Sequence, residues 1–158
     1  MPTKPTTEDP QAAGQPEPPV DHGALLDSVG YNCLQAYLAV VPDIKKQLAT
    51  LHLRPVEYTV LSLVHGNPGI NQKRLGQAIK VSPPNLATLL DRMQSDGLLE
   101  RQRNPRDKRS QILALTPRGQ RLCGQAEHLA AQAEAASTLS PADRRQLNAL
   151  LQKIFLAP

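Results

Sequence analysis

Residues 71–115 read NQKRLGQAIKVSPPNLATLLDRMQSDGLLERQRNPRDKRSQILAL, and this stretch decides the fold. Asn71 is a favourable N-cap residue for a short helix. Ser82 caps a second helix, in which Pro83 occupies the first turn and which Gly97 ends. Two short helices joined by a tight turn predict a helix-turn-helix motif.

The second of these helices has two different faces. Its buried stripe consists of apolar residues at helical spacing, namely Leu86, Leu89, Leu90 and Met93. Asn85, Thr88 and Arg92 recur at spacings of three and four, so they project together on the other side. The start of a helix directs its amides and the positive end of its dipole toward phosphate. We therefore expect these three residues, with Ser82 and Pro84 at the helix start, to contact double-stranded DNA.

Basic residues are concentrated in the same part of the chain. Between Asn71 and Ser110, nine Lys and Arg stand against four Asp and Glu, a local net charge of +5, whereas the rest of the chain carries −1. This confinement is typical of a phosphate-binding surface. Aromatic residues make up 3% of the chain, which favours duplex DNA over single strands or RNA, whose readers stack bases on aromatic rings. Gln72, Lys73 and Arg74 are expected to bind phosphates and position the protein.

A β-hairpin is predicted directly after the second helix. Residues 98–103 and 111–115 show strand-like alternation, and the stretch NPRD at 104–107 is rich in turn formers. A hairpin in this place is the wing of a winged helix. Its tip is expected to contact DNA through Arg106, Asp107, Lys108 and Arg109.

The segments that precede this motif are expected to form a tail and helices. Residues 1–21 are rich in proline and predicted to be a disordered tail. Apolar residues then recur at helical spacing until Pro42, which we expect to end or kink the helix, so that a separate short helical piece covers 44–51. Pro55 starts a further helix that runs to about His65.

Two helices are predicted after the wing. Thr116 with Pro117 starts a long helix that reaches about Ser137, and Ser140 caps a last helix that ends at Phe155. Apolar residues remain on the last helix without an obvious partner in one chain: Leu147, Leu150, Leu151 and Ile154. The expected fold is therefore mainly α with a small β wing. A single unit, 22–158, contains a winged helix-turn-helix at 52–116, and the helices of 22–51 and 117–158 bury apolar surface in a homodimer.

Three motifs carry a resemblance to a known family. They are DGLLER at 96–101, NPRDKR at 104–109 and LALTPRG at 113–119. These stretches resemble the multiple antibiotic resistance regulator (MarR) family, and weaker likeness extends from about Val29 to Leu156. The resemblance implies a transcriptional regulator, by default a repressor, whose dimer binds a palindromic operator, with Arg109 in the minor groove and Asp107 orienting it or a neighbouring arginine. The sequence departs from the family pattern at Pro42 and at Arg54, where the family often has Ser or Thr.

Two means of release from DNA are left open. The resemblance implies a small aromatic or phenolic acid, whose ring and carboxylate would suit side chains with an apolar body and a polar tip: Tyr31, Tyr37, Arg54, Tyr58 and His65. The rival is oxidation of the two cysteines, Cys33 and Cys123.

Other classes of protein are not favoured. The chain has no phosphate-binding loop, nucleophile motif or metal-ligand spacing, so we expect no enzyme, no cofactor and no metal. An architectural DNA binder would have less need of a base-reading face. Without a long apolar segment or signal peptide, the protein is expected to be soluble and cytoplasmic.

Overall fold

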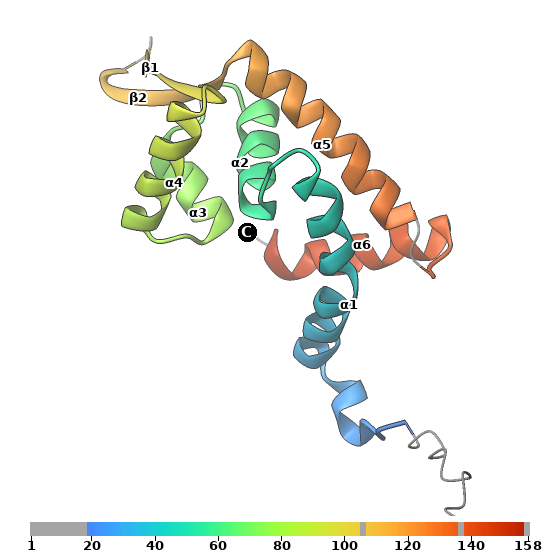
Figure 1. Ribbon diagram of the computed structural model, residues 1–158. Helices are drawn as coiled ribbons and strands as arrows, with labels where there is room; N and C mark the ends of the chain where they lie inside the picture. Colours follow the sequence, from blue (N-terminus) through green and yellow to red (C-terminus); the bar gives the residue numbers. More distant parts are fainter. Residues whose placement is uncertain (1–18, 105–106, 136–137, 157–158) are drawn as a thin grey trace, which may run out of the picture. The chain divides into compact units, whose positions relative to one another are not determined.

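The computed structural model describes residues 19–104, 107–135 and 138–156, with the backbone alone for 107–110. Within these residues it contains a 3-10 helix, Gly23–Asp27, six α-helices and one antiparallel hairpin (Figure 1). The helices are α1 (Val29–Ala49), α2 (Pro55–Gly66), α3 (Gln72–Ile79), α4 (Pro83–Ser95), α5 (Pro117–Ala135) and α6 (Pro141–Phe155), and the strands are β1 (Leu99–Asn104) and β2 (Asp107–Leu115). The expected mainly α fold with a β wing is confirmed. No helix among these residues is long and apolar enough to cross a membrane.

The contacts divide the chain into two compact units, Met1–Gln35 and Ala36–Pro158, with the boundary inside α1. In the first unit, residues 19–35 are exposed apart from the half-buried Tyr31, whose hydroxyl pairs with His22 Nδ1. The predicted tail lies outside the described residues up to position 18. The second unit contains the core and the winged helix.

The structure of α1 differs from the expectation that Pro42 ends the helix and leaves a separate short piece. Pro42 neither ends α1 nor separates a short piece at 44–51, because one helix continues from Val29 to Ala49 with Pro42 inside it. A proline in a helix interior removes a backbone hydrogen bond and costs about 3 kcal/mol. Packing after the proline offsets this cost, since Leu48 is fully buried and Ile44 packs against the core. Tertiary contacts thus override the local signal for a break.

The core of the second unit is built around α2. This helix contacts α3, β2 and α5, while α4 packs against α3 and β1. The largest fully buried side chains come from α1, α2, α3, α4, β1 and α5: Leu48, Val60, Leu61, Leu75, Leu86, Leu90, Met93, Leu99 and Cys123. A backbone hydrogen bond from Leu113 N to Ile70 O, 2.8 Å long, also attaches β2 to the residue that precedes the N-cap of α3. The wing is therefore fixed at its base to the helix-turn-helix.

Helix α4, the hairpin and α5 meet at one backbone junction. Gly97 takes a left-handed φ of 67° after α4, as its predicted role at the helix end requires. The amide of Thr116 donates to Leu98 O at 3.1 Å and its hydroxyl donates to Gly97 O at 2.7 Å. The same hydroxyl accepts from Gly119 N at 3.0 Å, which caps the start of α5. Both ends of the hairpin are thereby held together.

We predict that Gly119→Ala destabilises the protein by at least about 2 kcal/mol. A Cβ at this position would lie 1.9 Å from the carbonyl oxygen of Leu98, so the junction would have to open. Gly124→Ala is a matched control on the same helix, because a Cβ there meets nothing within 4 Å, and it should stabilise the helix by about 1 kcal/mol or less. Urea unfolding of both variants measures the difference. Equal stability of the two would contradict the proposed role of this close approach.

Candidate nucleic-acid interface

Helices α3 and α4 form the expected helix-turn-helix. Asn71 Oδ1 accepts from Arg74 N at 2.9 Å, which confirms the predicted N-cap of α3. Lys80 ends α3 in the left-handed conformation, with φ 53°, and Ser82 stands at the N-cap of α4. The two helices approach closely, since a Cβ on Gly76 would lie 3.0 Å from Leu86 Cδ2. A small residue at this position of α3 allows the tight turn.

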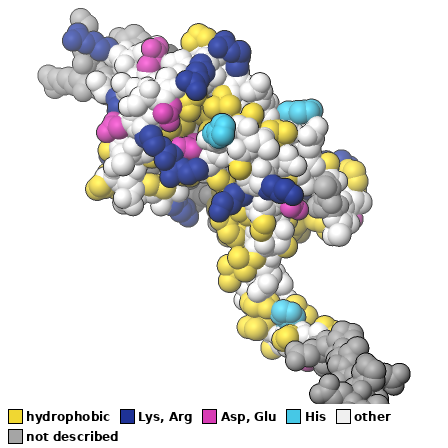
Figure 2. Space-filling model, in the orientation of Figure 1, with side chains coloured by type: hydrophobic (Ala, Val, Ile, Leu, Met, Phe, Trp, Pro, Cys, Tyr) yellow, Lys and Arg dark blue, Asp and Glu magenta, His cyan; other side chains and the backbone are white. Residues whose placement is uncertain are grey.

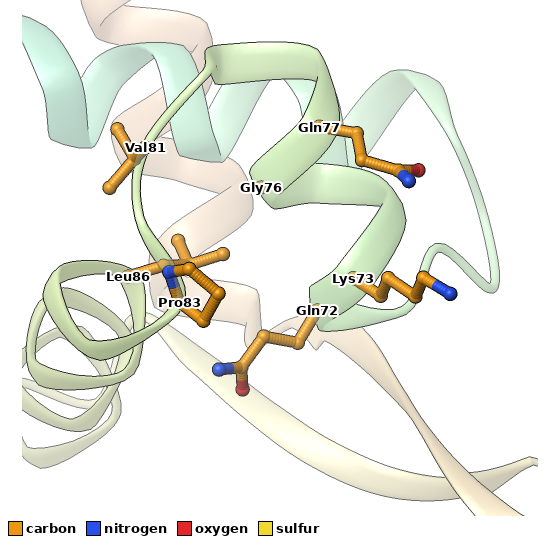
Figure 3. A pocket seen from close by; sticks show the side chains of 7 residues that line it. All are labelled: Gln72, Lys73, Gly76, Gln77, Val81, Pro83 and Leu86. Carbon is orange, nitrogen blue, oxygen red and sulfur yellow. The ribbon is translucent and has the colours of Figure 1, made fainter.

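A groove of about 620 Å³ lies between the two helices (Figure 3). Pro83 and Leu86 lie together beside α3, while Lys73 and Gln77 extend from α3 away from α4. Lys73 is thus on the outer side of α3 and exposed, where a phosphate could reach its ammonium group.

Most of the side chains expected to contact DNA in this motif are exposed. They are Lys73, Arg74, Ser82, Pro84, Asn85, Thr88 and Arg92, whereas Gln72 is half-buried. The hydroxyl of Thr88 donates to Pro84 O at 3.2 Å within the helix. Its proton is therefore used locally, and what remains for a DNA groove is the methyl group and an acceptor lone pair, which suits apolar contact with a thymine methyl. Figure 2 shows basic and acidic side chains intermingled over the helix-turn-helix and wing.

Arg92 has a different environment from Asn85 and Thr88. Its guanidinium forms an ion pair with Glu57, a carboxylate on α2 that is 4% exposed. Glu57 also accepts from Arg54 N at 2.8 Å and lies 3.3 Å from Arg54 Nη2. This pair anchors α4 to the start of α2. The Arg92 side chain is still 44% exposed, and its contact with DNA stays a prediction.

Glu57 was not among the predicted site residues. It stands at the third position of α2, where its carboxylate accepts from the backbone amide of the N-cap residue, which is the half of a capping box that an acidic side chain supplies. The family pattern of Ser or Thr at the N-cap is replaced by Arg54, so the usual sequence signature of this box was absent. The pattern Arg-Pro-x-Glu was the available signal for it.

The wing residues expected to touch DNA have no described side chains. Arg106 lies outside the described residues, and Asp107, Lys108 and Arg109 have no described side chains. Their backbone begins β2, and the pairing becomes irregular between Arg103 and Asn104. Contact of these residues with DNA stays a prediction.

Two of the five residues expected to bind an aromatic acid, Arg54 and His65, line different cavities, and binding of such an acid by the five stays a prediction. Arg54 lines a cavity of about 510 Å³ together with Glu57, Arg92 and Arg118. His65 lines another, of about 330 Å³. Tyr58 is half-buried beside Ser62, and its pKa is raised by burial and by nearby acidic groups. Tyr31 and Tyr37 are on α1 and line neither of these two cavities.

The two cysteines lie in different units and have different environments. Cys33 is exposed, whereas Cys123 is buried on α5 and its thiol donates to Glu127 Oε1 at 3.5 Å. Burial raises the pKa of the Cys123 thiol, and the Glu127 carboxylate raises it further. A raised pKa favours the neutral thiol over the reactive thiolate. This environment is that of a core thiol, and oxidation of Cys33 and Cys123 as a signal stays a prediction.

Comparison with known proteins agrees with the geometry of the winged helix. A model of the MarR family matches residues 53–111. The structure of the transcriptional repressor CouR bound to a 23-mer DNA duplex is 31% identical, covers 87% of this chain and 99% of its own, and superposes with a TM-score of 0.77. This chain belongs to the MarR family.

Two further relatives cover most of the chain. CouR from Rhodococcus jostii RHA1 bound to p-coumaroyl-CoA is 26% identical, covers 86% of this chain and 97% of its own, and has a TM-score of 0.76. A regulatory protein for the hcr operon of Thauera aromatica is 24% identical and covers 85% of this chain and 82% of its own. Membership of the MarR family makes this chain a transcriptional regulator and not an enzyme, as expected. Among the described residues, no cluster of His, Cys, Asp or Glu is suited to a metal ion.

We predict that Lys73→Ala and Asn85→Ala weaken DNA binding in different ways. Loss of a phosphate contact at Lys73 should weaken binding to all duplexes alike and reduce the slope of log affinity against log salt by about one per subunit. Loss of a base contact at Asn85 should cost about 1 to 3 kcal/mol on the operator and little on random duplex. Fluorescence anisotropy over a salt series measures both. An equal loss on operator and random DNA for Asn85→Ala would show that α4 is not the reader.

Proposed function

We propose that this MarR-family protein is a repressor that binds a palindromic operator as a homodimer and is released by an aromatic acid or its coenzyme A thioester. The observation that carries the DNA-binding part is the exposed polar face of α4. Asn85 and Thr88 in its first half and Arg92 in its second half are all exposed, and Arg92 is in addition paired with buried Glu57. A helix that is anchored near its end and presents exposed polar side chains from its first turns suits insertion into a major groove.

Exposed apolar residues on the terminal helices support a dimer. Helix α6 has no buried residue, and even its large apolar side chains are exposed, with Leu150 at 52% and Ile154 at 61%. Figure 2 shows hydrophobic side chains along the N-terminal part of α1, where Leu34 and Leu38 are exposed. Each helix thus offers an apolar surface that a single chain leaves in water, and a second copy with the same surfaces would cover it.

We predict that Leu150→Glu with Ile154→Glu separates the dimer. Burying two carboxylates in an apolar interface is unfavourable, so sedimentation at low micromolar concentration should show a monomer, and affinity for the full palindrome should fall by at least about a hundredfold. Gln152→Glu is the control, because this exposed residue is on the same helix and outside the Leu150 and Ile154 stripe. A native protein that sediments as a monomer would contradict the dimer.

The cavity between α2, α4 and α5 is the proposed effector site. It combines apolar walls, such as Leu51 and Leu122, with the guanidinium groups of Arg54 and Arg118. Arg118 also donates to Asp96 O at 2.7 Å, which holds it near the end of α4. Arginine pairs well with carboxylate or phosphate, and apolar walls suit an aromatic ring. The complex of CouR with p-coumaroyl-CoA indicates the ligand class to test.

We predict that p-coumaroyl-CoA or p-coumarate releases the protein from DNA upstream of its own gene. Anisotropy of labelled DNA should fall as the ligand is added, and Arg118→Ala should require at least about tenfold more ligand, since one charged contact is lost. Arg121→Ala is the control, because Arg121 is exposed on α5 and does not line the cavity. Specific DNA binding without release by either compound would overturn the effector class and leave the regulator intact.

A further inference from the structure

Arg101 on β1 joins the wing to the recognition helix. Its Nη2 lies 2.6 Å from Asp91 Oδ1 and its Nη1 donates to Gln94 Oε1 at 2.7 Å. Asp91 and Gln94 are three residues apart on α4, so the two arms of one guanidinium reach neighbouring positions of that helix. The side chain of Arg101 is 22% exposed, whereas that of Asp91 is 66% exposed.

This contact lies where the hairpin leaves the core. In the strand register Arg101 is opposite Leu113, a buried residue. Beyond this pair, none of the described side chains is buried: Gln102, Arg103 and Gln111 are exposed, and Asn104 and Ile112 are half-buried. A two-stranded hairpin is marginally stable alone, so its direction depends on its last fixed point. Arg101 and Leu113 together are that point.

We propose that Arg101 is a positioning residue that holds the wing at a fixed angle to α4, so that the wing and the Asn85 face engage DNA at once. The inference rests on the proposed binding of operator DNA. Arginine is suited to this task because its planar guanidinium makes two directed hydrogen bonds, which fix orientation as well as distance. Arg101 is in the basic stretch of the sequence, yet its cation is paired within the protein and serves no phosphate.

The effect of removing Asp91 on operator affinity distinguishes a positioning role of Arg101 from a purely electrostatic effect. Asp91→Ala deletes a negative charge beside DNA, which by charge alone strengthens binding to phosphates. If Asp91 holds Arg101, the same change releases the wing, and operator affinity should instead fall by about tenfold. Glu100→Ala deletes an equal charge on β1, where the carboxylate accepts from Gln102 at 2.6 Å and does not contact Arg101. This control should bind the operator at least as tightly as the native protein.

A double-mutant cycle and footprinting complete the test. The operator affinity of Arg101→Ala should also fall by about tenfold or more, because this change removes the bond to Gln94 as well as the pair with Asp91. The double variant Asp91→Ala, Arg101→Ala should lose no more affinity than Arg101→Ala, because the Asp91 contact is already broken in that single variant. Hydroxyl-radical footprints should lose protection at the operator flanks reached by the wing and keep it where α4 binds. Thermal midpoints should stay within about 4 °C of the native value, since pairs this exposed contribute little to stability.

The outcomes distinguish the two proposals. Native binding to the operator with tighter binding by Asp91→Ala, or additive losses in the double variant, would overturn the positioning role and leave the proposed function standing. If Arg101→Ala reduced the slope of log affinity against log salt by about one per subunit, Arg101 would be a phosphate contact, and the positioning role would again be overturned. Absence of specific binding by the native protein would overturn both.

Discussion

The close approach of α5 to the backbone of Leu98 is the constraint on which the winged helix depends. Gly119 has no side chain to separate them, and the Thr116 hydroxyl donates to Gly97 O while it accepts from Gly119 N. The end of α4, both strands of the hairpin and the start of α5 therefore share one hydrogen-bonded point. Any shift of α5 must be transmitted to the wing and to the recognition helix through this point, because close-packed backbone has little freedom to absorb it.

Two ion pairs then orient α4 from different elements. Asp91 and Arg92 are adjacent in sequence, yet one pairs with Arg101 of the wing and the other with Glu57 of α2. The second half of the recognition helix is thereby held by charges of both signs. Its first half, with Asn85 and Thr88, is left for DNA. Because Glu57 and Arg92 also line the proposed effector cavity, a bound anion would act on one of these two attachments directly.

The sequence predicted local features well and long-range pairings poorly. The caps at Asn71 and Ser140 were predictable because their hydrogen bonds reach only three residues along the chain, and both are present. The break at Pro42 was wrong because burial of Leu48 outweighs a local preference. The partner of Arg92 is thirty-five positions away in sequence, beyond the range of helical spacing. Of the predicted ligand residues, Arg54 and His65 line two different cavities, since chemical type does not determine location.

The same long-range ion pairs reduce the part of the local positive charge that is available to bind DNA. The count of +5 between Asn71 and Ser110 includes Arg92, but its charge is balanced by Glu57, which lies outside that stretch. Arg101 is balanced within the stretch by Asp91. The charge offered to DNA by the described side chains therefore resides on Lys73, Arg74, Lys80 and Arg103, which are all exposed. These four surround the recognition helix from α3, the turn and the wing, whereas the paired arginines set its orientation. Two of the three basic groups on α4 and β1, Arg92 and Arg101, are thus paired within the protein. The affinity of this surface for phosphate is therefore smaller, and its dependence on a fixed wing greater, than composition alone implies.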